Sequence, residues 1–250
     1  MTHLTILTGA SRGMGAAMAL QRLREGHHLV GISRQASAEL EDAAVAAGAS
    51  LLQWRSDLAE PASATGQLLA WLASQNPGRY SSATLINNAA TLPPLRPLAE
   101  IDATEVSRSL RVGLEAAMLL TGAFLRGTRA WAVPRKVLNI SSGLGRRPQA
   151  GSAAYCAAKA GMDLFSRAVA LEEASQPNGA RIVSLAPGVI DTDMQTQLRA
   201  ADPHSFPEHE VFVKLQANGQ LSTPAEAAAK VLAYLDRPGF GDKPQADVRD

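Results

Sequence analysis

Short apolar runs rich in β-branched residues alternate along the chain with longer segments in which apolar residues recur at helical spacing. The short runs are typical of strands, and the longer segments are typical of amphipathic helices. The predicted strands span residues 4–8, 29–33, 50–54, 83–87, 136–140 and 181–185. The predicted helices span residues 13–25, 38–47, 61–74, 101–126 and 153–175.

This order of elements predicts the fold class. Strands that alternate with helices through short connections imply right-handed βαβ crossovers and therefore a parallel sheet. The strands are apolar throughout rather than alternating, as expected when helices cover both faces of the sheet. We therefore expect one α/β domain over residues 1–250, a doubly wound parallel sheet of the Rossmann type with about seven strands.

Two segments interrupt the alternation. Residues 91–98 contain three prolines and are expected to form a loop. Residues 192–221 are polar, contain further prolines and follow a predicted strand end, so we expect a mobile lid over a substrate site. A helix is expected to resume after Thr223, because Thr-Pro-Ala-Glu combines a capping box with proline at the first helical position.

Composition and charge limit the classes of function. Apolar residues make up 46% of the chain and the formal net charge is +1, which gives no reason to expect nucleic acid or an anionic membrane as a partner. No apolar run is long enough to span a bilayer, and the first residues lack the pattern of a signal peptide. Cys156 is the only cysteine, which is typical of a reducing compartment. We expect a cytoplasmic protein that binds no metal.

A glycine-rich turn follows the first predicted strand, with the spacing T-G-x-x-x-G-x-G over residues 8–15. Such glycines allow a tight turn and the close approach of a pyrophosphate to a helix N-terminus. The second strand ends at Arg34 with no acidic residue before Glu39, whereas a free ribose 2′-hydroxyl is usually bound by an acid there. Arg34 and Arg12 suit a 2′-phosphate, so we predict NADP(H), against the alternative that Arg34 is an ordinary surface cation.

Tyr155 and Lys159 lie four residues apart, so both face the same side of a predicted helix. A free phenol titrates near pH 10, and a nearby ammonium lowers that pKa toward a range useful for acid–base catalysis. Ser142 follows the fifth strand, thirteen residues before Tyr155. We interpret Ser141 as structural and Cys156 as a small packing residue rather than a nucleophile.

These motifs together resemble the short-chain dehydrogenase/reductase family over essentially the whole chain. The glycine motif is residues 8–15, the acid on the adenine side matches Asp57 before Leu58, and the N-N-A-G motif reads Asn87-Asn88-Ala89-Ala90. The P-G motif after strand six matches Pro187-Gly188-Val189. The resemblance implies contacts with the cofactor from Gly9, Ser11, Arg12, Met14, Gly15, Arg34, Asp57, Leu58, Asn88, Ala89, Ala90, Tyr155, Lys159, Pro187, Gly188, Val189 and Thr192.

The resemblance also supplies catalytic roles. Ser142 would hydrogen-bond the substrate carbonyl oxygen, and Tyr155 would deliver a proton to it. Lys159 would hold the nicotinamide ribose and lower the pKa of Tyr155. One family position differs: Gly113 stands where the fourth helix normally carries an asparagine, which puts the usual proton relay in doubt and predicts a local kink or close packing.

The last third of the chain is similar to sepiapterin reductases and to bacterial benzil reductases that form (S)-benzoin. This branch implies an NADPH-dependent reductase of a ketone or vicinal diketone, with substrate contacts from Gly143, Leu144, Met194 and Asp247. Asp247 approximately matches an aspartate that anchors the pterin, and the alternative is a frayed surface residue. Family members commonly dimerise through their fourth and fifth helices, so the resemblance implies a homodimer or homotetramer.

Three other interpretations stay open. The chain could be a 3-oxoacyl thioester reductase or a general alcohol dehydrogenase of the same family. The missing asparagine makes a catalytically silent dinucleotide-binding regulator conceivable, although such proteins typically lose the tyrosine or lysine as well. A pure scaffold would need neither the glycine turn nor the Tyr155–Lys159 pair.

Overall fold

The computed structural model describes residues 1–250, and its centre is a seven-stranded sheet in the order β3-β2-β1-β4-β5-β6-β7. All neighbouring strands are parallel. The strands are β1 (Thr2–Thr8), β2 (His27–Ser33), β3 (Ser50–Arg55), β4 (Tyr80–Asn87), β5 (Arg135–Ile140), β6 (Arg181–Ala186) and β7 (Gln245–Asp247). This arrangement confirms the predicted fold class. The three-residue β7 was not among the predicted strands, because so short a run has no detectable period.

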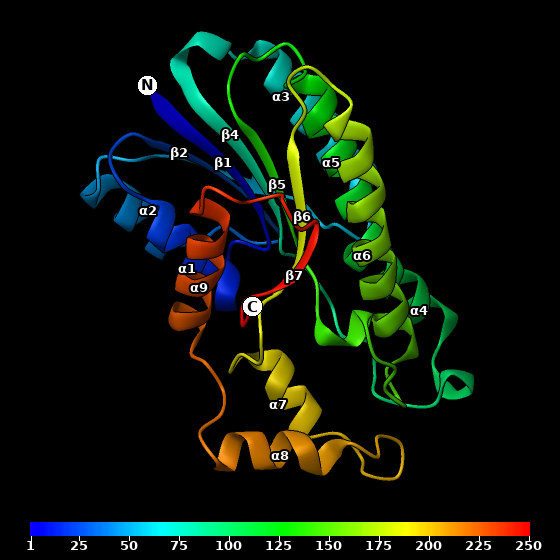
Figure 1. Cartoon of the computed structure of the whole chain (residues 1–250). Coiled ribbons are helices and arrows are strands. Elements are labelled where there is room, and N and C mark those ends of the chain that lie inside the picture. Colours follow the sequence, from blue (N-terminus) through cyan, green and yellow to red (C-terminus); the bar gives the residue numbers. More distant parts are fainter.

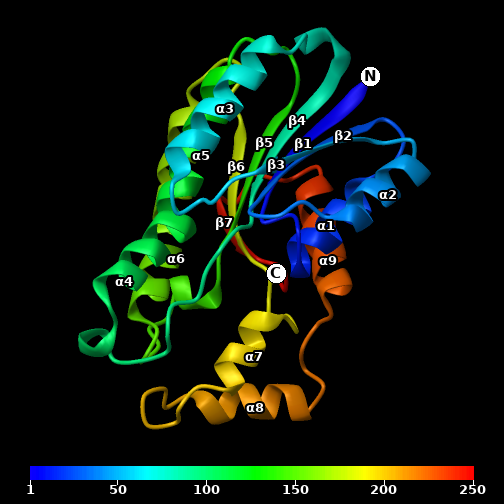
Figure 2. The same cartoon turned by 180° about the vertical axis from the view of Figure 1, so that it is seen from behind.

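Helices cover both faces of the sheet. They are α1 (Gly13–Arg22), α2 (Ala38–Ala46), α3 (Pro61–Ser74), α4 (Ala103–Leu110), α5 (Ala116–Gly127), α6 (Ala153–Ala174), α7 (Asp193–Arg199), α8 (His209–Ala217) and α9 (Pro224–Asp236). Figures 1 and 2 show α1, α2 and α9 on one face and α3, α5 and α6 on the other. Neighbouring strand residues such as Ile6 and Leu7 therefore enter different cores, and both are fully buried.

The predicted helix over residues 101–126 is interrupted. It consists of α4, one π-helical turn (Arg111–Glu115) and α5. Gly113 lies in that turn, and a Cβ atom on it would be 3.2 Å from the Cβ of Ala158 in α6. The predicted irregularity and close packing at Gly113 are confirmed, because a π-helical turn is one of the common causes of a kink.

The carboxyl ends of the strands all point toward α7 and α8, which lie beyond the sheet at the bottom of Figure 1. Residues 91–97 of the predicted loop 91–98 form no helix or strand, whereas Leu98 begins a short 3-10 helix, Leu98–Glu100. The helix α9 begins with the predicted capping box at Thr223. An apolar cluster joins the loop before α4 to the segment 192–221. Its members are Leu95, Leu198, Phe206 and Phe212. The segment is thus more ordered than its polar sequence suggests, because two short helices bury these side chains.

Candidate active site

The glycine turn between β1 and α1 is fastened to the end of β4. Thr8 Oγ1 accepts hydrogen bonds from the backbone N–H groups of Asn88 at 2.9 Å and Ala89 at 3.0 Å. In return, the Asn88 side-chain amide donates to the carbonyl oxygen of Thr8 at 3.0 Å. The structure therefore brings two of the predicted cofactor segments, residues 8–15 and 87–90, together at the carboxyl edge of the sheet.

Three glycines give this turn its shape. Gly9 and Gly13 have φ angles of +68° and +55°, in the region that favours glycine. Gly15 is required for space, since a Cβ there would lie 2.0 Å from the carbonyl oxygen of Gly9. Arg12, the residue before α1, makes no side-chain bond to the first helical turn, whose N–H groups have no intrahelical acceptor. These features fit the pyrophosphate of a dinucleotide.

Arg34 lies at the end of β2 and is exposed, as a contact to a 2′-phosphate requires. The pKa of the nearby Asp57 is lowered, chiefly because its carboxylate accepts a hydrogen bond from the backbone N–H of Ala59 at 3.0 Å. Arg108 of α4 also pairs with Asp57 at 3.0 Å, and Arg34 adds to the same shift. Near the ends of β2 and β3, two arginines, Arg34 and Arg108, thus lie beside one anchored carboxylate. Leu58 is buried next to them.

The segment after β6 approaches the glycine turn from the other side. Gly188 has a φ of +83°, and the chain then reaches Thr192, the residue before α7. The methyl group of Thr192 lies 3.5 Å from the position that a Cβ on Gly13 would take. Arg12 forms an ion pair with Asp193 at 2.9 Å. The predicted cofactor residues after Pro187 therefore do lie beside those of the first turn.

Tyr155 and Lys159 project from the first turns of α6 and are both buried, with 8% and 2% exposure. The Lys159 ammonium nitrogen lies 5.6 Å from the centroid of the Tyr155 ring and donates a hydrogen bond to the carbonyl oxygen of Ile140 at 2.7 Å. Ser142 follows β5 and begins a short helical turn, Gly143–Gly145. The end of β5 thus holds the predicted serine and fixes the lysine at the same time.

The protonation of this pair differs from the expectation. Burial raises the pKa of Tyr155 to about 12, and the Ser142 side chain opposes the shift. Burial also lowers the pKa of Lys159 to about 8, and Asp163 opposes that shift. The expected lowering of the Tyr155 pKa by Lys159 is not what the structure shows. The reason is physical: removing water disfavours the charged form of both groups, and the ammonium faces a backbone carbonyl rather than the phenol oxygen.

The predicted substrate residues occupy two places. Leu144 follows Gly143 in the turn after Ser142, and its backbone N–H donates to Ser142 Oγ at 3.2 Å. Met194 lies in α7 and packs against the apolar cluster of the segment 192–221. Leu144 therefore adjoins the predicted serine, Ser142, and Met194 belongs to the helices beyond the sheet.

Asp247 ends β7 and is 8% exposed, so the alternative of a frayed surface residue is wrong. Both of its carboxylate oxygens accept hydrogen bonds from the Arg249 guanidinium at 2.7 Å. The pKa of Asp247 is lowered, first of all by this pairing. The carboxylate is therefore buried, and Arg249 already binds it.

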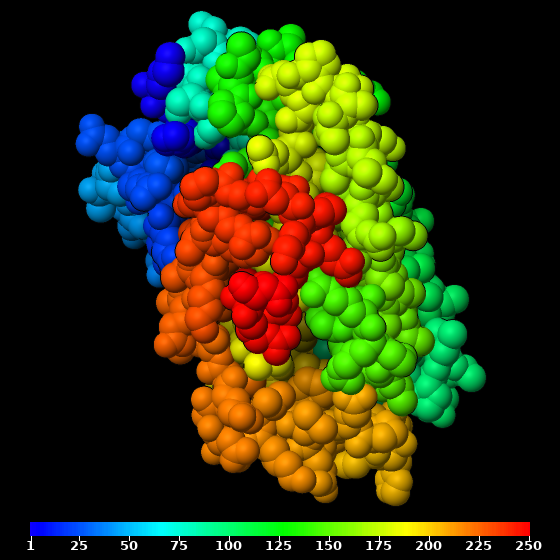
Figure 3. All heavy atoms as spheres, viewed as in Figure 1, coloured from blue at the N-terminus to red at the C-terminus, as the bar shows by residue number.

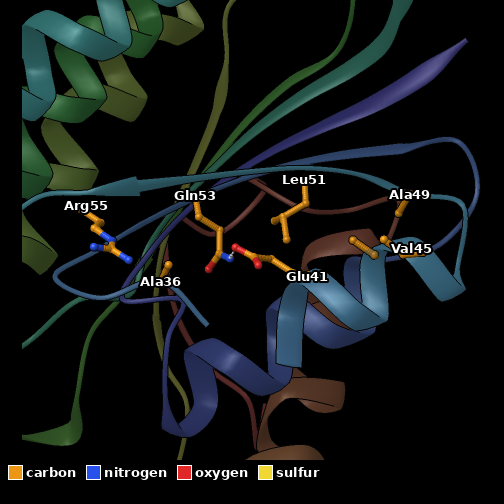
Figure 4. A pocket seen from close by; sticks show the side chains of 8 residues that line it. Ala36, Glu41, Val45, Ala49, Leu51, Gln53 and Arg55 are labelled. Carbon is orange, nitrogen blue, oxygen red and sulfur yellow. Dashed lines mark hydrogen bonds between the residues drawn. The ribbon is translucent and has the colours of Figure 1, made fainter. Parts of the chain in front are cut away.

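A cavity of about 460 Å³ lies outside this region, between α2 and the edge strand β3. Figure 4 shows its lining, in which β3 contributes the polar side chains of Gln53 and Arg55, with Gln53 next to Glu41 of α2. The Gln53 side chain is central to its polar contacts. That amide is already paired, because it donates to Glu41 and to the backbone oxygen of Ser37 and accepts from the Ser37 N–H. None of the predicted site residues lines the cavity.

A family model for short chain dehydrogenases matches residues 3–203. The chain belongs to this family. Short-chain dehydrogenases are oxidoreductases, and the branch expected from the residues after Pro187 is confirmed by the relatives. The chain is 34% identical over 243 residues to a benzil reductase, (S)-benzoin forming, from Bacillus cereus, covering 97% of this chain and 96% of that protein.

Two further comparisons agree. The chain is 31% identical over 257 residues to the sepiapterin reductase of Mus musculus, covering 98% of this chain and 96% of that protein. Among solved structures, a variant of the actinorhodin polyketide ketoreductase with NADPH matches with a TM-score of 0.79 at 25% identity, covering 99% of this chain and 95% of that one. No helix of this short-chain dehydrogenase has the length and apolar character needed to cross a membrane. No group of three acidic, histidine or cysteine side chains could hold a metal ion.

Sequence reasoning missed three charged partners of the predicted residues. Asp193 pairs with Arg12, Arg108 pairs with Asp57, and Arg249 pairs with Asp247. Only the Arg249–Asp247 pair could have been predicted from the sequence, because its two residues are two positions apart at the end of a strand. The other two pairs join segments that are distant in the sequence, and no spacing rule connects them.

Proposed function

We propose that this oxidoreductase is an NADPH-dependent carbonyl reductase that acts on a ketone or vicinal diketone. The observation that carries the proposal is the buried pair of Tyr155 and Lys159 beside Ser142, at the strand edge that also holds the glycine turn. The benzil reductase from Bacillus cereus, similar over nearly the whole chain, supports a diketone as the substrate class.

The raised pKa of Tyr155 suits a proton donor. At neutral pH the phenol keeps its proton, so it is ready to protonate a carbonyl oxygen on which negative charge develops. The Ser142 hydroxyl donates a hydrogen bond to the same oxygen and orients it. When bound, the reduced nicotinamide supplies the hydride to the carbonyl carbon. The O–H bond of Tyr155 breaks as the alcohol O–H forms, and the Lys159 ammonium stabilises the resulting phenolate until solvent returns a proton.

The cofactor preference follows from the cations on the adenosine side. Arg34 and Arg12 would hold the 2′-phosphate, and the glycine turn with Asn88 would hold the pyrophosphate and the adjacent ribose. Asp57 does not replace them as a ribose acid, because Ala59 and Arg108 already bind its carboxylate. NADPH is therefore the cofactor that the charges favour over NADH.

A pterin is the less favoured substrate. An aspartate anchors a pterin through the donors of its amino-pyrimidine ring, and Asp247 holds the matching position. Here its two oxygens already accept from Arg249 in a bidentate pair. Bidentate pairs of this kind are among the stronger hydrogen bonds in proteins, so a neutral diketone that needs no carboxylate fits better.

A screen of NADPH oxidation tests the proposed function. The panel is benzil, sepiapterin and an acetoacetyl thioester, each assayed with NADPH and with NADH. The expected result is the highest specificity constant for benzil with NADPH. A clear preference for the thioester would replace the proposal with a 3-oxoacyl reductase, and turnover of none of them would contradict it.

The segment 192–221 would act as the lid of this site. It is tied to the body by the Arg12–Asp193 pair and by Glu208, which accepts hydrogen bonds from Arg147 at 3.0 Å and Gln149 at 2.9 Å. These ties are polar, so ligands can compete for them, and the apolar contact of the segment with Leu95 would keep it attached to the body. Slower proteolysis of this segment with NADPH and substrate bound is the expected sign of closure.

The assembly would be a homodimer or homotetramer in the cytoplasm. Large apolar side chains are exposed on neighbouring faces of α5 and α6, which lie side by side in Figures 1 and 2. They are Met118, Leu119, Leu164 and Leu171. A symmetric partner helix pair would cover them, and sedimentation analysis measures the result.

A further inference from the structure

Asp163 is a buried carboxylate on α6, one helical turn after Lys159 and 4% exposed. It accepts hydrogen bonds from three other parts of the chain. Ser184 of β6 donates from its hydroxyl at 2.5 Å, and Gln245 of β7 donates from its amide at 2.8 Å. Arg146, just after the turn that begins at Ser142, donates from its Nε at 3.2 Å. A single side chain thus joins two strands and the serine turn to the helix of the catalytic pair.

Arg146 extends this connection. One of its terminal guanidinium nitrogens donates to the carbonyl oxygen of Ala246 at 2.6 Å, next to Asp247. In Figure 3 the C-terminal residues, in red, accordingly lie against the green residues that follow β5. The serine turn also packs directly on α6, since a Cβ on Gly145 would lie 2.9 Å from the backbone of Lys159. The position of Ser142 relative to Lys159 therefore depends on contacts that Asp163 completes.

Lys159 needs a negative charge nearby, because an ammonium without a partner is costly to bury. Its only hydrogen bond is to the Ile140 carbonyl. The other charged groups on α6 and on the elements packed against it are cations, or carboxylates that are exposed or paired with arginines elsewhere. The cations are Arg108, Arg111, Arg146, Arg167 and Arg181, and the carboxylates are Glu105, Glu115, Glu172, Glu173 and Asp247. Asp163 is the buried carboxylate one helical turn from Lys159, and although Arg146 also pairs with it, it is the group that opposes the lowering of the Lys159 pKa.

We propose that Asp163 is a positioning residue for the catalytic pair: its carboxylate holds the serine turn and the last strand against α6 and balances the buried charge of Lys159. The proposal rests on the proposed function, in which Lys159 acts as an ammonium. Asp163 itself touches no substrate or cofactor. Its effect on the reaction passes through Lys159 and through the turn after Ser142.

Replacing the carboxylate by a neutral amide of the same shape tests the charge. Asp163→Asn keeps an acceptor for Ser184, but without the negative charge the midpoint of the Lys159 titration should fall by about one pH unit or more. Carbon-13 NMR of lysine-labelled protein measures that midpoint directly, because the chain has only five lysines and Lys159→Met identifies the signal. In turnover assays, the alkaline limb of the kcat/KM profile should move to lower pH by the same amount.

Two further variants separate charge from packing. Ser184→Ala removes one hydrogen bond to Asp163 and no charge, so it should lower stability without moving the Lys159 midpoint. Arg146→Gln removes a cation from the same carboxylate, so the midpoint should rise. Arg146 is partly exposed, so this variant keeps the test decisive if Asp163→Asn does not fold. Opposite shifts in the two charge variants cannot come from loosened packing alone.

The outcomes distinguish this proposal from the proposed function. The NMR midpoint needs neither cofactor nor substrate, so it is informative even if no carbonyl compound is reduced. Folded Asp163→Asn protein with an unchanged Lys159 midpoint would overturn the inference, whatever the enzyme reduces. An unchanged midpoint in Arg146→Gln would do the same. A shifted midpoint in an inactive chain would leave this inference standing and remove the proposed function.

Discussion

Arg12 in the glycine turn and Asp193 in the first turn of α7 form an ion pair of 2.9 Å that joins the cofactor turn to the segment 192–221. Both side chains are exposed, at 68% and 74%. The pair engages one of the two cations proposed for the 2′-phosphate, so NADPH would have to compete with a carboxylate of the same protein. The contact would then couple binding of the phosphate to the position of the proposed lid.

Removing the competing charge should improve binding of NADPH. Asp193→Asn frees Arg12, and exposed ion pairs contribute about 0.2–1 kcal/mol, so the Kd for NADPH should fall by up to about fivefold. The Kd for NADH should not change, because NADH lacks the phosphate. Fluorescence titration measures both constants. Glu208→Gln is the matched control, because it removes a carboxylate of the same segment that binds Arg147 and Gln149 rather than Arg12. Equal changes for the two cofactors would contradict the competition.

Arg34 should set the preference between the two cofactors. A hydrogen bond to a charged group is worth about 1.5–3 kcal/mol, so Arg34→Asp should lower the ratio of specificity constants for NADPH and NADH by about ten- to a hundredfold or more. Lys243→Asp serves as the control. It makes the same change of charge just before β7, at the amino-terminal end of that strand rather than at the carboxyl ends where the site lies. Equal specificity constants in the unmodified enzyme would show that Arg34 does not bind a phosphate.

Gly113 should matter for packing more than for chemistry. Alanine in place of glycine in a helix gains about 0.5–1 kcal/mol of stability, and Gly122→Ala in α5 should show that gain because nothing lies within 4 Å of the added methyl group. Gly113→Ala should not show this gain in stability, because its methyl group meets the Cβ of Ala158 at 3.2 Å. Urea unfolding compares the two variants. Equal stabilisation of both would mean that the contact with Ala158 costs nothing.

The same position tests whether the missing asparagine silences the enzyme. The π-helical turn is present with glycine, and the backbone carbonyls that could hold a relay water remain. Gly113→Asn should therefore change turnover of an accepted diketone by less than about tenfold, which corresponds to about 1.4 kcal/mol in the barrier. If only the asparagine form reduces the diketone, the native chain is a silent binder.

Two histidines at the amino end of β2 should make the fold sensitive to acid. Burial lowers the pKa of both His27 and His28 below the usual value near 6.5. As the pH falls below 6.5, the unfolded chain takes up protons first, so the free energy of unfolding should decrease. His28→Gln should weaken this dependence in urea unfolding between pH 5 and 8, whereas His204→Gln, on an exposed loop, should not. Parallel curves for all three proteins would refute the assignment.

Much of the fold could be predicted because its strands are apolar runs and its turns carry glycine. The six predicted strands all exist, and each extends by one to three residues beyond its predicted limits. The break at Gly113 was also predictable from one residue. By contrast, α7 and α8 were not predicted, because their stability comes from burying side chains such as Phe206 against the distant Leu95. Patterns within one segment carry no information about such contacts.

The candidate site divides in the same way. Motif spacing placed Ser142, Tyr155 and Lys159, and the structure brings them to one strand edge. Motif spacing did not reveal that burial would be the main cause of the shifted pKa values of Tyr155 and Lys159, because the depth of a side chain depends on the whole fold. Nor did it reveal Asp163, although that residue lies four positions after Lys159 on the same helix face. The helical spacing that identified the pair would have identified the third member.

The central claim is that Tyr155 is the proton donor of a carbonyl reductase. Tyr155→Phe removes one oxygen from a buried side chain and leaves the glycine turn and Lys159 in place. The measurement is kcat for benzil reduction by the variant, beside its Kd for NADPH. We predict that kcat falls by about a hundredfold or more while the Kd changes little. Near-native turnover by Tyr155→Phe would contradict the account.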